Sequence, residues 1–244
     1  MARILVTGSA GGLGRAAAAS LIDDGHDVVV HARSEARLAA VEDLLAAGAG
    51  RVVGDLGELD QTRRVAEHVA ALGPFDAVIH NAGVIAGRAL LPVNVVAPYV
   101  LTALVPATRL VYLSSSMHRG GSGDLSRADW SGARHTLSYS DSKLLVTTLM
   151  AAIARHWPRV LSNAVDPGWV PTRMGGPSAS DDLALGHVTQ AWLATSNDPD
   201  AVVSGGYWFH LRTEQPHPAV HDEALQDALL AALAGHTGID LPHG

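Results

Sequence analysis

The stretch Thr7-Gly8-Ser9-Ala10-Gly11-Gly12-Leu13-Gly14 joins a short apolar strand, Ile4–Val6, to an expected helix over Leu13–Asp24. Glycines in such a turn let backbone N–H groups come close to a diphosphate, and the N-terminus of the following helix favours its negative charge. The turn therefore indicates a nucleotide-binding site. A glycine-rich turn also occurs where a strand and a helix are simply joined tightly, so the rest of the sequence decides between these two interpretations.

Beyond this turn, short β-branched runs alternate with helical patterns. The expected strands are Ile4–Val6, Val28–Val30, Val52–Val53, Ala77–Ile79, Leu110–Leu113, Val160–Val165 and a last strand, Gly206–His210. The expected helices are Leu13–Asp24, Glu35–Ala47 with Ser34 as its N-cap, Glu58–Leu72, a stretch from Tyr139 to about Arg155, Leu183–Thr195 and Asp222–Ala234. This order predicts an α/β fold, a doubly wound parallel sheet of about seven strands with helices on both faces.

Composition narrows the class of protein. The chain has 244 residues, of which 48% are hydrophobic and 25 are glycine, which suits one packed α/β domain over residues 1–244. It has no Cys and its 13 His are scattered, so we expect neither disulfides nor a metal site. A net charge of −7 without a cluster of Lys or Arg disfavours nucleic acid as a partner. The apolar runs are too short for a signal peptide or a membrane span, so we expect a cytoplasmic protein with no membrane partner.

Polar or glycine-rich groups follow six expected strands, at the edge where open parallel sheets bind ligands. They are the glycine-rich turn, His31-Ala32-Arg33-Ser34, Gly54-Asp55-Leu56, Asn81-Ala82-Gly83, Ser114-Ser115-Ser116 and Asp166-Pro167-Gly168. Tyr139 and Lys143 lie four apart and share one face of a helix. An ammonium beside the phenol favours tyrosinate, so we expect the pKa of Tyr139 to move from about 10 toward neutrality and the phenol to serve as an acid or base. A Tyr and a Lys at this spacing also occur on ordinary helices.

These motifs, taken in order, resemble the short-chain dehydrogenase/reductase family over nearly the whole chain. The resemblance rests on the glycine-rich turn, Asn81-Ala82-Gly83, Asn94, a strand-end Ser and the pair Tyr139 and Lys143. It implies a Rossmann-type sheet and an oxidoreductase in which a bound nicotinamide cofactor carries the hydride. It also implies that Tyr139 donates a proton in reduction, Lys143 lowers its pKa and holds the nicotinamide ribose, Ser115 binds the substrate carbonyl, and Asn94 completes a proton relay.

The cofactor contacts follow from the turn, the second strand end and the resemblance. The expected set is Gly8, Ser9, Gly12, Leu13, Gly14, Arg33, Ser34, Asp55, Leu56, Asn81, Ala82, Gly83, Tyr139, Lys143, Pro167, Gly168, Val170 and Thr172. No carboxylate stands at the second strand end to bind the ribose 2′-OH of NAD, whereas Arg33 with Ser34 can bind a 2′-phosphate. We therefore expect NADP(H) to be preferred, with NAD(H) possible.

Two spacings depart from the common family pattern. The segment between Gly83 and Asn94 is short, which puts the relay role of Asn94 in question. Ser115 lies 24 residues before Tyr139, a wide spacing that resembles the retinol-dehydrogenase-like and carbonyl-reductase members. Ser126 lies 13 residues before Tyr139, which matches the commoner spacing, but it follows a flexible glycine-rich stretch. Ser115 directly follows a strand, so we favour Ser115 as the group that polarises the carbonyl.

The sequence leaves several alternatives open. The stretches near 116–136 and 169–187 are expected to border the substrate, although Pro167–Asp182 suits either a lid or an ordinary surface loop. Asp222–Ala234 could pack on the sheet or against a second subunit, and the resemblance implies a homo-oligomer. A non-catalytic cofactor sensor would not need Tyr139 and Lys143, and a nucleotide-sugar epimerase or dehydratase resembles a longer chain. The fold does not identify the small carbonyl or alcohol substrate, nor the direction of the reaction.

Overall fold

The computed structural model describes residues 1–134 and 136–242. His135, within the expected loop 116–136, and residues 243–244, at the end of the expected domain, lie outside the described residues. The strands are β1 (Arg3–Val6), β2 (Asp27–Ala32), β3 (Gly50–Val53), β4 (Phe75–His80), β5 (Ala107–Leu113), β6 (Leu161–Asp166), β7 (Tyr207–Phe209) and β8 (Arg212–Glu214). The α-helices are α1 (Gly12–Asp23), α2 (Glu35–Leu38), α3 (Glu42–Ala46), α4 (Leu59–Ala71), α5 (Ala97–Leu104), α6 (Tyr139–His156), α7 (Val188–Thr195) and α8 (Glu223–Thr237). Shorter helical turns are η1 (Ala39–Val41), the π-helical η2 (Pro92–Val96), η3 (Ser116–Gly120), η4 (Leu125–Arg127) and η5 (Pro218–His221).

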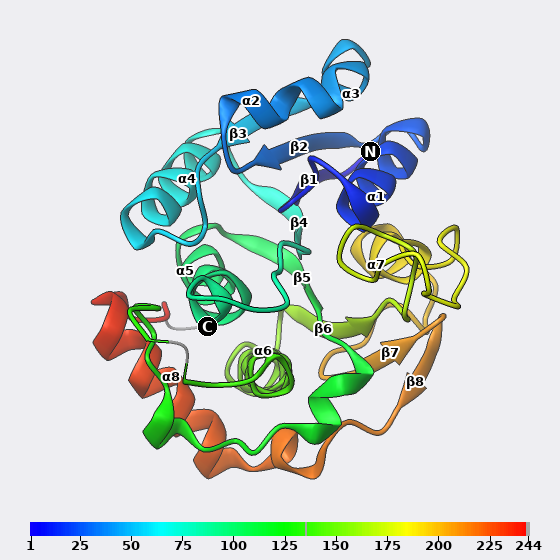
Figure 1. Cartoon of the computed structure of the whole chain (residues 1–244). Coiled ribbons are helices and arrows are strands. Elements are labelled where there is room, and N and C mark those ends of the chain that lie inside the picture. The colour runs from blue at the N-terminus through cyan, green and yellow to red at the C-terminus, as the bar shows by residue number, and fades with distance from the viewer. Residues whose placement is uncertain (135, 243–244) are drawn as a thin grey trace.

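These strands form one sheet in the order β3-β2-β1-β4-β5-β6-β7-β8 (Figure 1). Neighbouring strands from β3 to β7 are parallel, and only β8 joins its neighbour in antiparallel register. The strand order reverses between β1 and β4, so the loops after these two strands flank the crevice in which doubly wound sheets bind ligands. The predicted α/β doubly wound architecture is confirmed.

Side chains of the central strands alternate between two apolar cores. Ile4 and Val6 enter one core and Leu5 the other, as the two-residue period of a strand requires. Helices α4, α5 and α6 cover one face of the sheet, and α1, α2, α3 and α7 cover the other (Figure 1). Helix α8 packs along the outer side of α6, which leaves α6 buried without a break from Asp141 to Ile153. A helix enclosed in this way offers a firm base for the residues on its first turns.

The start of α6 is fixed by a capping box. The Ser138 hydroxyl accepts a hydrogen bond from the backbone N–H of Asp141 at 3.1 Å, and the Asp141 carboxylate accepts one from the backbone N–H of Ser138 at 2.9 Å. The same carboxylate accepts a bond from the backbone N–H of Ser122 at 2.8 Å. Both the helix start, where Tyr139 stands, and the chain after η3 are therefore held by one carboxylate.

Four helices or strands differ from the expected ones, among them α5, which was not predicted from the sequence. The sheet gains β8 because His210 and Leu211 adopt positive φ angles of 45° and 64° and close a hairpin without the usual Asn or Gly. The expected helix Glu35–Ala47 breaks into α2, η1 and α3, since Val41 takes a φ of −134° while its side chain is fully buried. The expected helix Leu183–Thr195 begins only at Val188.

No helix of residues 1–134 and 136–242 has the length and apolar character needed to cross a membrane.

Candidate active site

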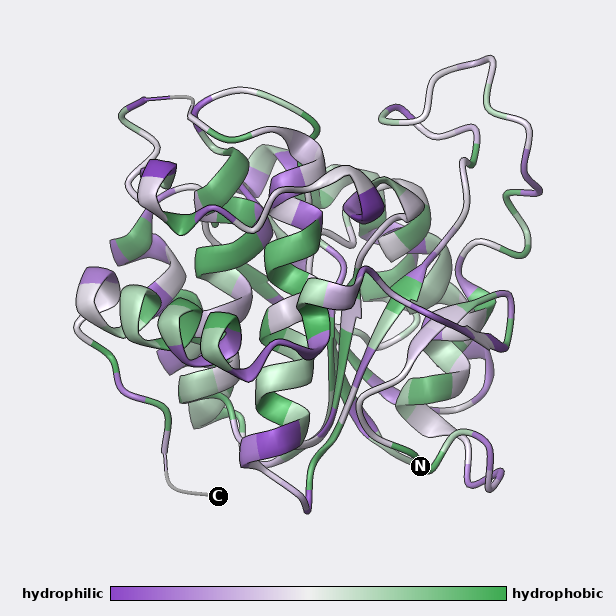
Figure 2. Cartoon of the chain, turned by 90° about the horizontal axis from the view of Figure 1, so that it is seen from below, coloured by the Kyte–Doolittle hydropathy of each residue, from purple (hydrophilic) through white to green (hydrophobic). Residues whose placement is uncertain are grey.

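The loops that follow adjacent strands meet at one edge of the sheet. Because β1, β4, β5 and β6 are parallel neighbours, the glycine-rich turn and the groups that begin at Asn81, Ser114 and Asp166 all emerge there. Figure 2 shows the N-terminus, where β1 begins, at the lower edge of the molecule and long loops at the opposite, upper edge. The strand-end groups singled out from the sequence therefore share one edge.

The glycine-rich turn is in tight contact with the end of β4. The Asn81 amide donates a hydrogen bond to the Thr7 carbonyl oxygen at 2.9 Å, and the Ala82 N–H donates to the Thr7 hydroxyl at 3.0 Å. A Cβ at Gly14 would lie 2.3 Å from Asn81 Nδ2, and one at Gly8 would lie 2.8 Å from the Ala82 Cα. Gly8 and Gly14 are thus required by close approach, which the turn pattern anticipated.

His31 braces the same turn from beneath, a role that the sequence pattern did not reveal. Its Nδ1 accepts a hydrogen bond from the Gly8 N–H at 3.0 Å, and its Nε2 lies 2.9 Å from the Gly54 carbonyl oxygen. Nδ1 must be unprotonated to accept, so the proton of the neutral ring lies on Nε2. The ring is 3% exposed, and burial lowers the pKa of His31, which keeps it neutral. The loops after β1 and β3 are joined through this ring.

Ser9 is an expected cofactor contact whose side chain lies in the protein interior. Its hydroxyl is fully buried, donates to the Val6 carbonyl oxygen at 2.9 Å and accepts from the His31 N–H at 2.8 Å. Leu56 and Val170 are likewise expected contacts whose side chains are buried, at 4% exposure each. These three residues can reach a cofactor only through their backbone.

The residues around the turn fit a phosphorylated dinucleotide. No side chain caps the N-terminus of α1, and no acidic residue stands in its first turn, so its N–H groups and the helix dipole remain available to a diphosphate. Arg33 is exposed and has no hydrogen-bond or ion-pair partner among residues 1–134 and 136–242. Arg37, which the sequence reasoning missed, is half-buried and donates to the Ala10 carbonyl oxygen at 3.2 Å. Two guanidinium groups thus flank the turn. Asp55 follows β3 and is half-buried, with Oδ1 accepting from the Gly57 N–H at 2.8 Å.

The candidate catalytic groups lie together where β5 ends and α6 begins. Tyr139 is the first residue of α6, and its phenol lies close enough to the Ser115 side chain for Ser115 to influence its pKa. Lys143 stands one turn later, is 5% exposed, and donates from Nζ to the Leu113 carbonyl oxygen at 2.6 Å. Its Nζ lies 5.6 Å from the centre of the Tyr139 ring. The geometry brings a phenol, a hydroxyl and an ammonium to one point.

The expected acidification of Tyr139 is wrong in this structure. Burial raises the pKa of Tyr139 to about 12; the nearby Ser115 side chain opposes this rise and the Asp166 carboxylate adds to it. Burial also lowers the pKa of Lys143 to about 8, while Asp166 acts to raise it. Burial outweighs the Lys143 ammonium, which is bonded to the Leu113 carbonyl and has its Nζ 5.6 Å from the centre of the phenol ring. Tyr139 is therefore protonated at neutral pH.

Asn94 reaches the site despite the short segment before it. It lies in the π-helical turn η2, a feature often found at functional sites. Its Oδ1 accepts from the Val84 N–H at 2.8 Å, and its Nδ2 donates to the Val84 carbonyl at 2.9 Å and to the Ser142 hydroxyl at 3.0 Å. A Cβ at Gly83 would lie 3.5 Å from Asn94 Oδ1 and 3.6 Å from Lys143 Nζ. The amide therefore braces the loop after β4 against α6, and its part in a relay stays a prediction.

The competing serines occupy different surroundings. Ser126 is exposed and donates to the Asp124 carboxylate at 2.6 Å, within its own turn. Ser114 is buried and lies 2.6 Å from the Thr147 hydroxyl on α6. Ser116 is exposed at the start of η3. Ser115, in contrast, contacts Tyr139, as its place at the end of β5 suggested.

The loop after β6 closes back on the glycine-rich turn. A Cβ at Gly12 would lie 3.7 Å from Thr172 Cγ2, and one at Gly186 would lie 2.7 Å from Leu13 Cδ2. Asp166, another residue not assigned from the sequence, accepts from the Gly168 N–H at 3.0 Å and from the Tyr207 hydroxyl at 3.2 Å. Pro167 and Gly168 are half-buried beside it. The expected nicotinamide segment thus lies next to the turn expected to hold the phosphates.

Comparison with known proteins agrees with this arrangement. The family model for short chain dehydrogenases matches residues 2–183. The chain is 36% identical over 258 residues to the short-chain dehydrogenase chyC of Penicillium rubens, covering 99% of this chain and 100% of that protein. It is 31% identical over 267 residues to DnrU of Streptomyces sp. strain C5, provisionally named a daunorubicin C-13 ketoreductase, covering 96% of this chain and 92% of that one.

Solved structures show the same fold. An uncharacterized protein from Mycobacterium Paratuberculosis superposes with a TM-score of 0.80 at 24% identity, covering 99% of this chain and 95% of that one. A protein of Escherichia coli CFT073, solved in complex with NADPH, superposes with a TM-score of 0.68 at 25% identity, covering 86% of this chain and 96% of that one.

Proposed function

Because the chain belongs to the short-chain dehydrogenase family and is an oxidoreductase, we propose that it reduces a ketone or aldehyde with NADPH, or oxidises the corresponding alcohol with NADP+. A bound nicotinamide cofactor supplies or accepts the hydride. The protein has to hold that cofactor, orient the substrate carbonyl and move one proton to or from its oxygen.

One observation carries the proposal: Tyr139, Ser115 and Lys143 meet where β5 ends and α6 begins. With its pKa at about 12, the Tyr139 hydroxyl keeps its proton at neutral pH and can donate it to a carbonyl oxygen that gains negative charge. The Ser115 hydroxyl, which lies close to the same phenol, can hold that oxygen in place. Lys143, with a pKa of about 8, is mostly charged at pH 7 and favours the tyrosinate left behind.

The preference for NADP(H) rests on Arg33. A free guanidinium at the end of β2, with Arg37 beside the turn, suits a 2′-phosphate through charge-assisted hydrogen bonds. Ser34 is exposed next to Arg33 and can add a hydroxyl contact. The NADPH bound to the similar Escherichia coli protein supports this choice.

A carbonyl substrate is supported by the proton donor and by one relative. DnrU is named for reduction of a ketone, and this chain covers 92% of it. A sensor that only binds cofactor would not need the contact between Tyr139 and Ser115. We therefore favour a catalytic reductase over a sensor.

The proposal is tested by offering a panel of ketones, aldehydes and secondary alcohols to the purified protein and following the oxidation of NADPH and NADH, or the reduction of NADP+ and NAD+, optically. We expect turnover of at least one carbonyl compound, faster with NADPH than with NADH. Tight cofactor binding with no turnover on any compound would contradict the proposal and favour a sensor.

A further inference from the structure

Large apolar side chains stand exposed directly after three of the strand-end groups. Ile85 is 54% exposed, Met117 52%, Trp169 54% and Met174 42%. We call these four side chains the apolar rim. Exposed apolar groups are unremarkable when they are scattered, but a concentration of them beside a site indicates a binding surface.

The backbone of the rim lies close to the candidate catalytic atoms. The Met117 N–H donates to the Ser115 hydroxyl at 3.2 Å. Ile85 follows soon after Gly83, whose Cβ position lies 3.6 Å from Lys143 Nζ. Trp169 follows Gly168, which is bonded to Asp166 at the end of β6. Three separate segments therefore bring apolar side chains to the border of one reaction centre.

Trp169 is held in a fixed orientation. Its backbone N–H donates to the Asp181 carboxylate at 2.6 Å, and the Asp181 N–H donates back to the Trp169 carbonyl at 3.0 Å. The indole Nε1 donates to the Gly175 carbonyl at 2.9 Å, so the polar edge of the ring is already paired. An indole anchored by its edge and still 54% exposed offers apolar surface to a ligand without first having to be ordered.

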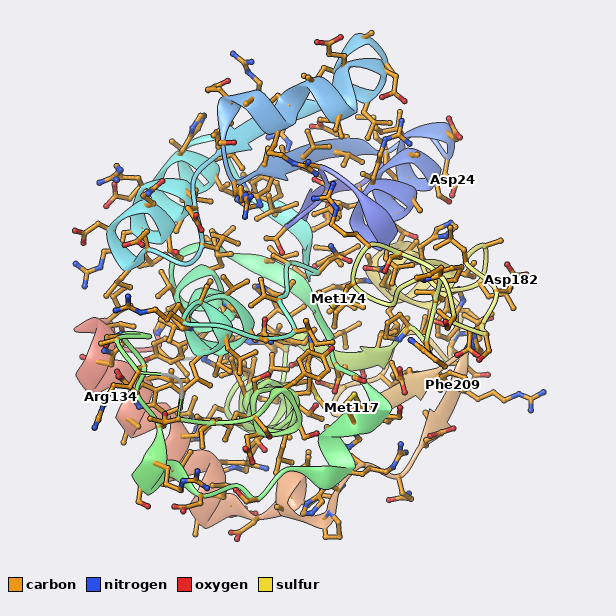
Figure 3. All side chains as sticks on the ribbon, viewed as in Figure 1. Asp24, Met117, Arg134, Met174, Asp182 and Phe209 are labelled. Carbon is orange, nitrogen blue, oxygen red and sulfur yellow. The ribbon has the colours of Figure 1, made fainter. Side chains whose placement is uncertain are left out.

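The two methionines of the rim, Met117 and Met174, add apolar surface to that of the Trp169 indole. Figure 3 labels Met174 on the loop after β6 and Met117 on η3, both in the middle of the face shown. Unbranched thioether side chains adapt to ligands of different shape and make favourable contacts with aromatic rings. Two charged groups near the rim are engaged with other residues, since Arg119 pairs with Glu214 at 2.8 Å and Asp181 is bonded to Trp169.

We propose that the apolar rim selects aromatic carbonyl compounds with fused rings over small polar ketones. This inference rests on the proposed reductase function and names its substrate class. A flat ring system would cover surface of Trp169 and the two methionines that a small hydroxylated ketone would leave in water. The gain would appear mainly in KM, because the rim touches the ring system rather than the reacting carbonyl.

The test compares 2-acetylnaphthalene with hydroxyacetone as substrates for NADPH oxidation by the full chain. We expect the native protein to favour 2-acetylnaphthalene in kcat/KM by about a hundredfold or more, the scale of 2 to 3 kcal/mol of buried apolar contact. Trp169→Ala should reduce this ratio about tenfold through KM, while Trp169→Phe keeps most of it. Met117→Ala should reduce it less. Leu72→Ala, which removes an exposed apolar group at the end of α4, serves as the matched control and should change nothing.

Failure of the rim and failure of the reductase function give different results. If the native protein reduces hydroxyacetone with a kcat/KM equal to that for 2-acetylnaphthalene, or if Trp169→Ala keeps the native ratio, the rim proposal is overturned and the reductase function stands. If neither ketone is reduced, calorimetric titration of 2-acetylnaphthalene into the complex of the protein with NADP+ tests whether the apolar rim binds fused aromatic rings. Binding that is weakened about tenfold by Trp169→Ala supports the rim, and binding that is absent or insensitive to this change overturns it.

Discussion

The two halves of the ligand-binding edge are built differently. On the cofactor half, formed by the loops after β1, β2 and β4, the polar groups are bonded to the interior, as when Gly8 bonds to His31 and Asn81 to Thr7. On the substrate half, formed by the segments after β5 and β6, large apolar side chains are exposed, and the indole of Trp169 is bonded within its own loop, to the Gly175 carbonyl. A ligand common to many relatives is thus met by preformed backbone, while the variable ligand is met by side chains on loops.

Among the variants that compare the two halves, the largest expected effect separates two serines of the substrate half. Ser115→Ala should lower kcat by roughly a hundredfold or more, because it removes the donor that holds the reacting oxygen, with NADPH affinity almost unchanged. Ser126→Ala is the matched control, since the Ser126 hydroxyl bonds to Asp124 within its own turn, and it should keep native turnover. Steady-state kinetics with any ketone that the native protein reduces checks both variants. A larger loss for Ser126→Ala would show that the stretch 116–134 reaches the reaction centre in a way not visible here.

A glycine of the cofactor half should give the next largest effect. Gly14→Ala places a methyl 2.3 Å from Asn81 Nδ2, so Asn81 or the turn must move, at a cost of about 1 to 3 kcal/mol in unfolding free energy. NADPH affinity should fall about tenfold, because the turn loses its shape. Gly235→Ala on α8 meets no atom within 4 Å, and should raise stability by up to about 1 kcal/mol with native affinity. Native NADPH affinity in Gly14→Ala would show that the turn is not preformed for the cofactor.

Arg33 tests the choice of cofactor. Dissociation constants for NADPH and NADH should differ in the native protein, and Arg33→Ala should reduce that difference about tenfold or more, the scale of one charge-assisted hydrogen bond. Arg51→Ala removes an exposed Arg of the neighbouring strand that lies 3.8 Å from Glu35, and should leave the difference intact. A native protein that binds both cofactors equally would refute the assignment.

The smallest effect concerns His31 and depends on pH. Burial lowers the pKa of His31 below its usual 6.5. Only the neutral ring can accept the hydrogen bond from the Gly8 N–H. The contribution of this hydrogen bond to holding the turn is therefore complete above pH 6.5 and is lost as the pH falls through the pKa of His31 in the folded protein. Native NADPH affinity should therefore hold at neutral pH and weaken as the pH falls below 6.5 and through the lowered pKa of His31, by up to about tenfold per unit once the ring titrates.

The variant His31→Asn separates this effect from titration of the cofactor itself. It keeps an acceptor near Gly8 that cannot be protonated in this range, so its affinity should fall less steeply with pH than that of the native protein. His26→Asn is the matched control, because His26 accepts from the Ala2 N–H at 3.1 Å at the far end of β2. Identical pH profiles for the native protein and His31→Asn would contradict the role given to the ring.

The fold was predictable where local signals agreed with packing. The strands around β1 and β4 are short, β-branched and followed by polar groups, so their order and the doubly wound sheet could be derived from the sequence. Helix α5 was not predicted because Ala97–Leu104 and the preceding η2 are buried on nearly all sides and show no period of polar residues. Strand β8 was not predicted because its residues Arg212–Glu214 are polar and exposed.

The site was predictable as a set of strand ends but not as a set of contacts. The places of Ser115, Tyr139 and Lys143 follow from spacing and strand order. The role of His31 depends on a ring that bonds two loops distant in sequence, and no spacing rule indicates such a bridge. The raised pKa of Tyr139 depends on burial and on where Lys143 Nζ points, which a one-turn spacing on a helix does not determine.

The most direct test of the account is single-turnover reduction by Tyr139→Phe with NADPH already bound. We expect NADPH affinity within about twofold of native and a reduction rate lower by about a hundredfold to ten-thousandfold, since only the transferable proton is removed. Tyr99→Phe, which removes the buried hydrogen bond from Tyr99 to the Ile239 carbonyl, should reduce at the native rate. Native-rate reduction by Tyr139→Phe would contradict the account.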